Sequence, residues 1–388
     1  MAPSAPTSYS STDADVCFQL PAGTQSGQPA GITGTRLVSG PGAGIDLIEL
    51  CSGPLKVWIV PTRGMGIWRA ELNGIPVEWK SPVRRLVHPK LVNLQSRNGL
   101  GWLDGFSELV CRCGLAFNGP PETDAGAKSP IESEVTLHGR IANIPAHSVE
   151  ARIEGDLLVC EGRVAESTLF GPQLELKTRV ELPLGGTAFE VIDEVTNLGS
   201  GATELELLYH INVGRPFLDE GAKVAIPHRQ VVPRDPRAAE GIDSYPTYLG
   251  PTAGYAEQAY FYEPIADASG RTIALLRNAA GDRGFSVEFS PAELPRFVTW
   301  KCTQPEADGY VTGLEPATNL PNPKSFERQQ GRVISLPSGQ TYRSSFRIRI
   351  DDTANGVREV ESRIAAIQGS TAPTIHRTPQ KGWSPSGG

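Results

Sequence analysis

The sequence predicts an all-β protein, built as a large sandwich of antiparallel sheets, and three observations support this fold class. Apolar and β-branched runs recur along the 388 residues, as in LKVWIVP and TYRSSFRIRI. The chain also carries 42 glycines and 33 prolines, which suit tight turns between short strands. Only one segment, near the C-terminus, has a convincing helical pattern. Because so many strands do not fit in one flat sheet, two large curved sheets are expected.

The individual strands follow from local patterns. Asn73-Gly74 lies between two strand-like runs, IWRAEL and IPVEW, and predicts a hairpin with a two-residue turn. Residues 147–167 and 174–199 each have the pattern of a strand, a glycine-containing turn and a second strand. Further strands are expected within residues 203–214, 271–290, 296–302, 308–315, 331–339 and 341–350.

The one expected helix lies between residue 352 and Gly369. Asp352 or Thr353 can cap its first turn, and Gly369 can end it. Its apolar positions fall at helical spacing, at Val357, Val360, Ile364 and Ile367.

The chain is expected to form one domain over residues 16–369. Residues 1–15 are rich in Ser, Thr, Ala and Pro, and residues 370–388 have a similar composition. Both ends are therefore expected to be flexible tails. Between them the sequence contains no internal repeat and no long linker.

Composition and charge exclude several classes of partner. The formal charge is −7, and no basic run occurs, so nucleic acid and anionic membranes are not expected partners. No apolar run is long enough to span a bilayer, and a signal peptide is not supported, so a cytoplasmic location is expected. The six scattered cysteines then indicate reduced thiols. The histidines lack metal-ligand spacing and no nucleotide-binding motif is present, so neither a metal nor a cofactor is expected.

Glu315 has an unusual position, at the end of an apolar strand in GYVTGLEPATNLPNP. Alternation puts Val311, Gly313 and Glu315 on one face, and Gly313 leaves room beside the carboxylate. Pro316 is expected to end the strand, because proline cannot continue a central ladder. Glu315 is therefore a candidate functional carboxylate beside an open space. The alternative is a capping or salt-bridged glutamate.

His210 is the second candidate. In TELELLYHINVG, alternation puts it on the face opposite Tyr209 and Ile211, which have the character of core residues. His210 then points toward solvent or a cleft. A surface histidine without a function is the alternative.

His138 is the third candidate, in EVTLHGRIANIPAH. It follows a strand and precedes Gly139, and a corner of this kind can present His138, Arg140 and Asn143 to a ligand. The alternative is a solvated turn in which Gly139 supplies a positive φ.

Three further side chains are weighed as ligand contacts. Arg63 leaves an apolar strand, and is either a ligand arginine or a buried arginine that stabilises a turn. Trp102 lies in the glycine-rich GLGWLDGF, where it can face a sugar ring or pack in the core. Lys301, next to Trp300 on the strand before Glu315, can neutralise that carboxylate.

Together these segments resemble the aldose 1-epimerase (galactose mutarotase-like) superfamily, and in particular a bacterial branch known mainly as a domain of unknown function. The resemblance covers roughly residues 35–350. It implies a β-supersandwich with a sugar site, a carboxylate base and two histidines. By the resemblance, LEPATN assigns Glu315, YHINVG assigns His210 and LHG assigns His138. The other matching stretches are PTRGMGIWRAELNGIPVEWKSP, GLGWLDGF and CGLAFNGPP.

The resemblance implies an isomerase that interconverts the anomers of a small-molecule carbohydrate, as a monomer or homodimer. In this mechanism Glu315 is the base, His210 the acid and His138 an orienting group. The substrate-binding candidates are Arg63, Trp102, Arg140, Asn143, Asn212 and Lys301. Two alternatives stay open. One is an isomerase, epimerase or lyase that acts on a keto-sugar or sugar acid, with or without the help of a metal, and the other is a non-catalytic sugar-binding protein.

Overall fold

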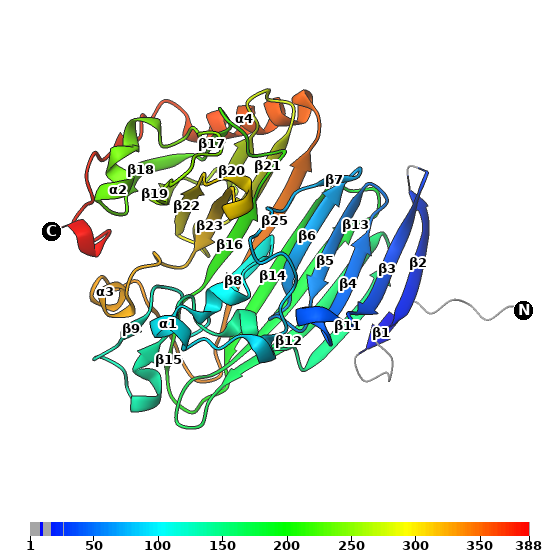
Figure 1. Cartoon of the computed structure of the whole chain (residues 1–388), viewed down its shortest axis with the longest axis horizontal. Helices are drawn as coiled ribbons and strands as arrows, with labels where there is room; N and C mark the ends of the chain where they lie inside the picture. The colour runs from blue at the N-terminus through cyan, green and yellow to red at the C-terminus, as the bar shows by residue number, and fades with distance from the viewer. Residues whose placement is uncertain (1–7, 11–16, 26, 388) are drawn as a thin grey trace, which may run out of the picture.

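The computed structural model describes residues 8–10, 17–25 and 27–387, which form mainly antiparallel strands (Figure 1). Two large sheets, of 13 and nine strands, dominate the structure, and two further sheets have two strands each. The predicted all-β sandwich of large antiparallel sheets is therefore confirmed. No helix in this part of the chain combines the length and the apolar character that crossing a membrane requires.

The 13-stranded sheet carries the site described below. Its order is β2-β3-β4-β5-β6-β8-β16-β23-β22-β19-β18-β26, and β7 pairs with β6 outside this path. Its strands are β2 (Phe18–Gln25), β3 (Gln28–Arg36), β4 (Asp46–Cys51), β5 (Leu55–Val60), β6 (Gly66–Leu72), β7 (Ile75–Pro76), β8 (Val110–Cys113), β16 (Leu208–Val213), β18 (His228–Pro233), β19 (Gln258–Pro264), β22 (Arg296–Cys302), β23 (Val311–Ala317) and β26 (Thr374–Ile375).

The nine-stranded sheet packs behind it, in the order β1-β11-β12-β13-β14-β25-β21-β20-β17. Its strands are β1 (Ser8–Ser10), β11 (Ser148–Glu154), β12 (Leu157–Ser167), β13 (Gln173–Pro183), β14 (Ala188–Asn197), β17 (Lys223–Ala225), β20 (Thr272–Arg277), β21 (Gly284–Phe289) and β25 (Thr341–Asp351). The small sheets pair β9 (Glu122–Thr123) with β10 (Glu134–Val135), and β15 (Thr203–Leu205) with β24 (Ile334–Leu336).

The hydrophobic core lies between the two large sheets. Side chains in β12, β13 and β14 alternate between buried and partly exposed, as expected for strands with one face against a core. One cluster of buried residues joins both sheets, with Ile48 and Val57 from the 13-stranded sheet and Leu176 and Phe346 from the other. Burial of this apolar surface is the main force that holds the layers together.

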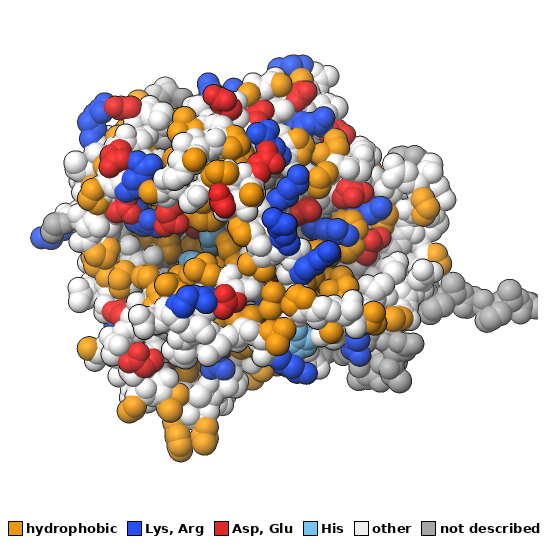
Figure 2. All heavy atoms as spheres, in the orientation of Figure 1, with side chains coloured by type: hydrophobic (Ala, Val, Ile, Leu, Met, Phe, Trp, Pro, Cys, Tyr) orange, Lys and Arg blue, Asp and Glu red, His pale blue; other side chains and the backbone are white. Residues whose placement is uncertain are grey.

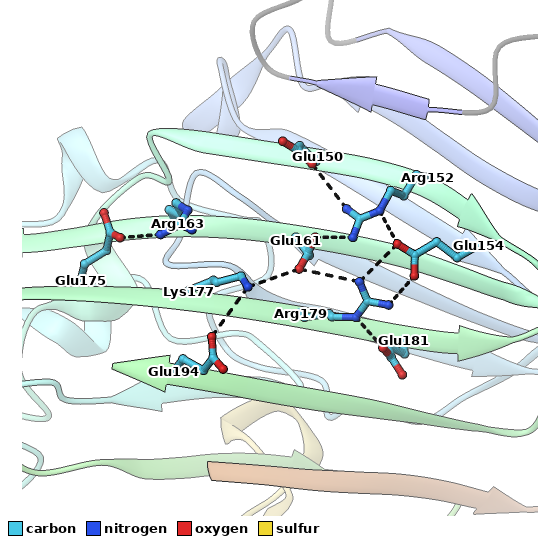
Figure 3. A network of polar contacts seen from close by, with 10 residues as sticks. All are labelled: Glu150, Arg152, Glu154, Glu161, Arg163, Glu175, Lys177, Arg179, Glu181 and Glu194. Atoms are coloured by element: carbon cyan, nitrogen blue, oxygen red, sulfur yellow. Dashed lines mark hydrogen bonds and ion pairs between the residues drawn. The ribbon is translucent and has the colours of Figure 1, made fainter. Parts of the chain in front are cut away.

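The opposite face of β11–β14 carries rows of paired charges (Figure 3). Arg179 lies 2.6 Å from Glu154, and Arg163 lies 2.6 Å from Glu175. Exposed ion pairs of this kind contribute little individually, because water and salt screen them. Their main consequence is a polar outer face, which leaves only the inner face of these strands for packing.

The predicted hairpin is confirmed. Asn73 and Gly74 join β6 to β7 with φ values of 51° and 83°. Both residues are thus in the left-handed region that a type I′ turn requires, and this requirement explains the preference for Asn-Gly.

The predicted C-terminal helix is also confirmed, as α4 (Ala354–Gln368). The Thr353 side chain accepts a hydrogen bond from the Gly356 amide at the start, and Gly369 follows the last turn with a φ of 60°. The buried side chains of α4 pack against β20. The other helices are α1 (Ser96–Gly99), α2 (Pro236–Glu240) and α3 (Lys324–Gln329).

Pro316 lies inside β23, which continues to Ala317, so the prediction that Pro316 ends the strand is wrong. Toward β22, Pro316 keeps register with Phe297. Toward β16, Leu314 and Ala317 are paired, but Glu315 and Pro316 between them are not. The missing proline N–H therefore falls at a gap in the ladder, where the strand does not need it.

The C-terminal segment differs from the flexible tail predicted for residues 370–388. β26 pairs in parallel with β18, and Trp383 packs against a buried cluster that includes Phe261. These contacts attach the segment to the 13-stranded sheet despite its loop-like composition. The predicted N-terminal tail, residues 1–15, lies outside the described residues except for Ser8–Ser10, which forms β1 on the edge of the other sheet.

Candidate active site

Glu315 and His210 come from β23 and β16, which are neighbours in the middle of the 13-stranded sheet. Tyr209, Ile211 and Leu314 belong to the core between the sheets. Alternation along each strand therefore turns His210 and Glu315 to the other face, away from the nine-stranded sheet. Figure 2 shows histidine side chains at the base of a hollow on this side of the molecule.

The two side chains face each other. His210 Nε2 lies 3.4 Å from Glu315 Oε1, within ion-pair distance, but the contact does not have hydrogen-bond geometry. Glu315 Oε1 is buried and has no hydrogen-bond partner, and the carboxylate lines a cavity. Because buried polar atoms are almost always paired, an unpaired carboxylate oxygen at a cavity wall indicates a position for a ligand group.

Asn212 fixes the tautomer of His210. Its amide nitrogen donates to the carbonyl oxygens of Glu108, at 3.0 Å, and of His210, at 3.1 Å. The amide oxygen of Asn212 therefore faces His210 Nδ1, at 2.7 Å, and accepts from it. With the proton on Nδ1, the lone pair of Nε2 is directed toward Glu315.

His138 lies in the loop after β10, on the same cavity. Its φ is 58°, and its Nδ1 donates to the carbonyl oxygen of Asn118 at 2.8 Å. The His138 ring lies 5.6 Å from the ring of His210 and 4.7 Å from that of Trp102. The loop therefore holds the imidazole beside His210 and leaves its Nε2 free to accept a hydrogen bond.

The cavity has a volume of about 530 Å³, a size suited to a small ligand. Its walls are largely aromatic, from Trp79, Trp102, Phe106 and Trp300. The rings of Phe106 and Trp300 lie 5.0 Å and 5.3 Å from the ring of His210. Glu315 and His210 thus lie in a largely apolar pocket.

Arg234 and Glu257 supply further polar groups to this cavity. Glu257 accepts a hydrogen bond from Trp300 Nε1 at 2.6 Å and one from Arg234 at 3.0 Å. The three side chains hold one another in place at the cavity wall, where they can meet hydroxyl groups of a ligand. Among the described residues, no group of three or more His, Cys, Asp or Glu side chains is arranged to hold a metal ion.

Burial shifts the pKa of all three candidate catalytic groups. It raises the pKa of Glu315 well above its ordinary value. It lowers the pKa of His210 to about 3, with a further contribution from nearby His138, and it lowers the pKa of His138 itself to about 4. Burial therefore favours the neutral form of each of these three groups.

Gly313 gives the carboxylate its space, as the sequence predicts. A Cβ atom at this position would lie 2.3 Å from Glu315 Oε1 and 3.2 Å from His210 Cε1. Any larger residue would displace Glu315 and His210 from their present arrangement.

Arg63 and Asn143 do not line the cavity, which corrects their prediction as substrate-binding residues. Arg63 is buried, and its Nε lies 2.5 Å from Glu108. It also donates to Asn143 Oδ1 at 3.1 Å and to the carbonyl oxygen of Gly105 at 3.0 Å. Arg63 is thus a buried arginine that stabilises its own turn and the neighbouring loops, which was the alternative interpretation.

Arg140 and Lys301 also lie elsewhere. Arg140 lines a different cavity, of about 440 Å³, and donates to Thr168. Lys301 donates to two backbone carbonyls and lies 4.7 Å from the ring of Tyr248, and burial lowers its pKa to about 8. Asn212 acts through His210 and is not a cavity residue. Of the six predicted substrate contacts, only Trp102 lines the site.

The low pKa of His138 leads to a prediction about stability. Between pH 7 and pH 5, wild type is expected to lose more stability than His138→Asn. The folded-state pKa of about 4 lies below the ordinary 6.5, so the unfolded chain binds more protons in this window and stability falls as the pH falls. Asn does not titrate and tolerates a positive φ. Thermal unfolding at both pH values measures the difference.

The control for this prediction is His147→Asn, which changes an exposed histidine. It should follow wild type at both pH values. Equal losses of stability in wild type and His138→Asn would contradict the prediction.

The chain has a galactose mutarotase-like fold, and comparison with known proteins supports this fold class. Residues 42–350 match the family described as "Domain of unknown function (DUF4432)". The chain belongs to this family. No curated protein matches the chain.

Among solved structures, a "putative aldose 1-epimerase" from Klebsiella pneumoniae is 32% identical, with a TM-score of 0.90 over 96% of this chain and 99% of that one. A galactose mutarotase-like protein from Clostridium acetobutylicum is 17% identical, with a TM-score of 0.59 over 84% and 99%. A galactose 1-epimerase from Lactobacillus acidophilus is 12% identical, with a TM-score of 0.56 over 84% and 99%. The last two show similarity of fold alone.

Proposed function

We propose that this protein is a carbohydrate-active enzyme that interconverts the anomers of an aldose by acid/base catalysis. The observation that carries the proposal is the Glu315–His210 pair, which is 3.4 Å apart with an unpaired carboxylate oxygen at the wall of an aromatic cavity. Anomer exchange needs one group that takes a proton and another that gives one. A protein that only binds sugar needs no such pair.

Two proton transfers, one to Glu315 and one from His210, account for this reaction. In the reactive state Glu315 is ionised and His210 is protonated on Nε2. Glu315 takes the proton of the anomeric hydroxyl while His210 donates to the ring oxygen, and the bond between that oxygen and C1 breaks to give the open aldehyde. Both groups are then neutral, which is the state that burial favours. After C1 rotates, the reverse transfers close the ring and restore the pair.

The surrounding residues have positioning roles in this proposal. Asn212 holds His210 with Nε2 toward Glu315. His138 Nε2 accepts a hydrogen bond from a sugar hydroxyl, and Trp102 packs against an apolar ring face. Arg234 and Glu257 bind further hydroxyl groups. The name of the 32% identical Klebsiella protein, a "putative aldose 1-epimerase", supports an aldose as the substrate class.

The test is NMR exchange spectroscopy on a panel of aldoses in D₂O, with and without the protein. The expected result is faster exchange between anomers with no deuterium bound to carbon. Deuterium at a carbon position would instead favour an isomerase or epimerase that abstracts a carbon-bound proton. Saturable binding without acceleration would favour a sugar-binding protein. A carbohydrate partner, a monomer or homodimer and a cytoplasmic location remain predictions from the sequence.

A further inference from the structure

A second cavity adjoins the site and is not used by the mechanism above. This side cavity, of about 430 Å³, shares Trp79, Ser81 and Val83 with the site cavity. Its other lining residues come mainly from β6, from the segment after β7 and from the loop before β23. A ligand that reaches past the segment 79–83 would therefore occupy both cavities.

The side cavity is rich in positive charge. Arg69, Lys80 and Arg84 line it, and within the described residues none of the three is within ion-pair distance of a carboxylate. It also contains two acidic residues, Glu306 and Glu78. Glu306 lies 2.6 Å from Arg215, and burial raises the pKa of Glu78. Figure 2 shows a group of Lys and Arg side chains beside the hollow that contains the histidines.

Three buried polar atoms in this cavity have no hydrogen-bond partner: Arg69 Nε, Ser107 Oγ and Glu78 Oε2. Arg69 and Ser107 supply the donors. The Arg69 guanidinium lies over two indole rings, 4.3 Å from the ring of Trp58 and 4.5 Å from that of Trp68. Unpaired donors that are held in place among positively charged side chains are suited to bind the oxygens of an anion.

We propose that the side cavity binds a negatively charged substituent, a phosphate or a carboxylate, of the sugar whose anomeric centre lies between Glu315 and His210. This inference rests on the proposed function and narrows its substrate class from aldoses in general to anionic aldoses. The aromatic site cavity holds the ring, and the side cavity holds the charge. A neutral hexose would leave the donors of Arg69 and Ser107 unpaired, at a cost in affinity.

The experiment compares kcat/KM for anomer exchange of three probes: a hexose 6-phosphate, a hexuronate and the parent hexose. Wild type is expected to prefer at least one of the charged probes. The double variant Lys80→Ala/Arg84→Ala, which changes exposed side chains, should reduce that preference by at least about tenfold. The matched control is Arg85→Ala, because Arg85 is the exposed neighbour of Arg84 but does not line the cavity. It should keep the wild-type preference.

Calorimetric binding of the same probes separates this inference from the proposed function. In one outcome no probe is turned over, but a charged probe binds to wild type and binds at least about tenfold more weakly to the double variant. This outcome would support the anion site in the side cavity and contradict the proposed catalytic function. If the neutral hexose is turned over as well as both charged probes, or if the double variant keeps the wild-type preference, the side-cavity inference is overturned and the catalytic proposal stands. Inorganic phosphate should compete with the hexose phosphate, and failure to do so would count against an anion site.

Discussion

Replacing Glu315 by glutamine is expected to slow protein-accelerated anomer exchange by about 10²- to 10⁴-fold, the usual contribution of a positioned acid or base. Glutamine has nearly the same shape as a protonated glutamate, the form that burial favours here. The substitution therefore removes the ability to take a proton without leaving a cavity or a buried charge. NMR exchange rates measure the effect, and thermal unfolding is expected to show little change.

The matched control is Glu194→Gln, the same chemical change on the outer face of the nine-stranded sheet (Figure 3). It should leave the exchange rate at the wild-type value. If Glu315→Gln and Glu194→Gln accelerate exchange equally, Glu315 is not the base.

The effects of substitutions at Glu315 and His210 on the rate of anomer exchange should also be strongly non-additive. His210→Asn alone is expected to slow exchange by a similar factor, because the two proton transfers depend on each other. Once Glu315 is replaced, a second change at His210 should cost little more, as is usual for residues that act as one unit. Losses that multiply in the double variant would instead indicate two independent contributions.

Within a single strand, alternation predicts the two faces but not which face borders the site. It correctly separates His210 from Tyr209, because the apolar character of Tyr209 and Ile211 marks the core side. It separates Trp300 from Lys301 equally well, yet neither residue is clearly a core residue. Which of these two side chains faces the cavity depends on strand pairing, in which Trp300 is opposite Gly313. A single sequence does not reveal that register.

Arg234 and Glu257 show a second limit of prediction from sequence. They flank β18 and β19, which are paired in space, but 23 residues separate them along the chain. No local pattern marks either residue. Arg63 is a structural residue that the sequence could not identify as one. Its buried partner Glu108 is 45 residues away, so the sequence alone left both a ligand arginine and a structural arginine open. Residues that depend on long-range partners need the tertiary structure.

The largest loss of stability is expected from Arg112→Met, at about 3–5 kcal/mol. Arg112 in β8 forms a two-pronged pair with Asp193 in β14, with N–O distances of 2.6 Å and 2.9 Å, and both side chains are almost fully buried. Tyr209 and Thr178 complete the network, with Tyr209 donating to Asp193 at 2.8 Å. Removing the guanidinium leaves the Asp193 charge buried between the sheets without a counter-ion.

The double variant Arg112→Met/Asp193→Asn should recover much of this loss, because it removes the unpaired charge together with its partner. Urea unfolding measures both variants. The control is Arg36→Met, which breaks an ion pair whose arginine is half exposed and should cost less than about 1 kcal/mol. A loss for Arg112→Met no larger than that of the control would contradict the prediction.

The same network connects stability to the site. Arg112 is opposite Tyr209 in the β8–β16 pairing, and the next pair is Cys111 opposite His210. Tyr209 and Arg112 point inward to the ion pair, so His210, one residue on, must point outward to Glu315. A variant that loosens the inner contacts should therefore also disturb the 3.4 Å approach of His210 to Glu315. We expect Arg112→Met to lower the exchange rate of the folded protein, and the double variant to restore the rate together with the stability.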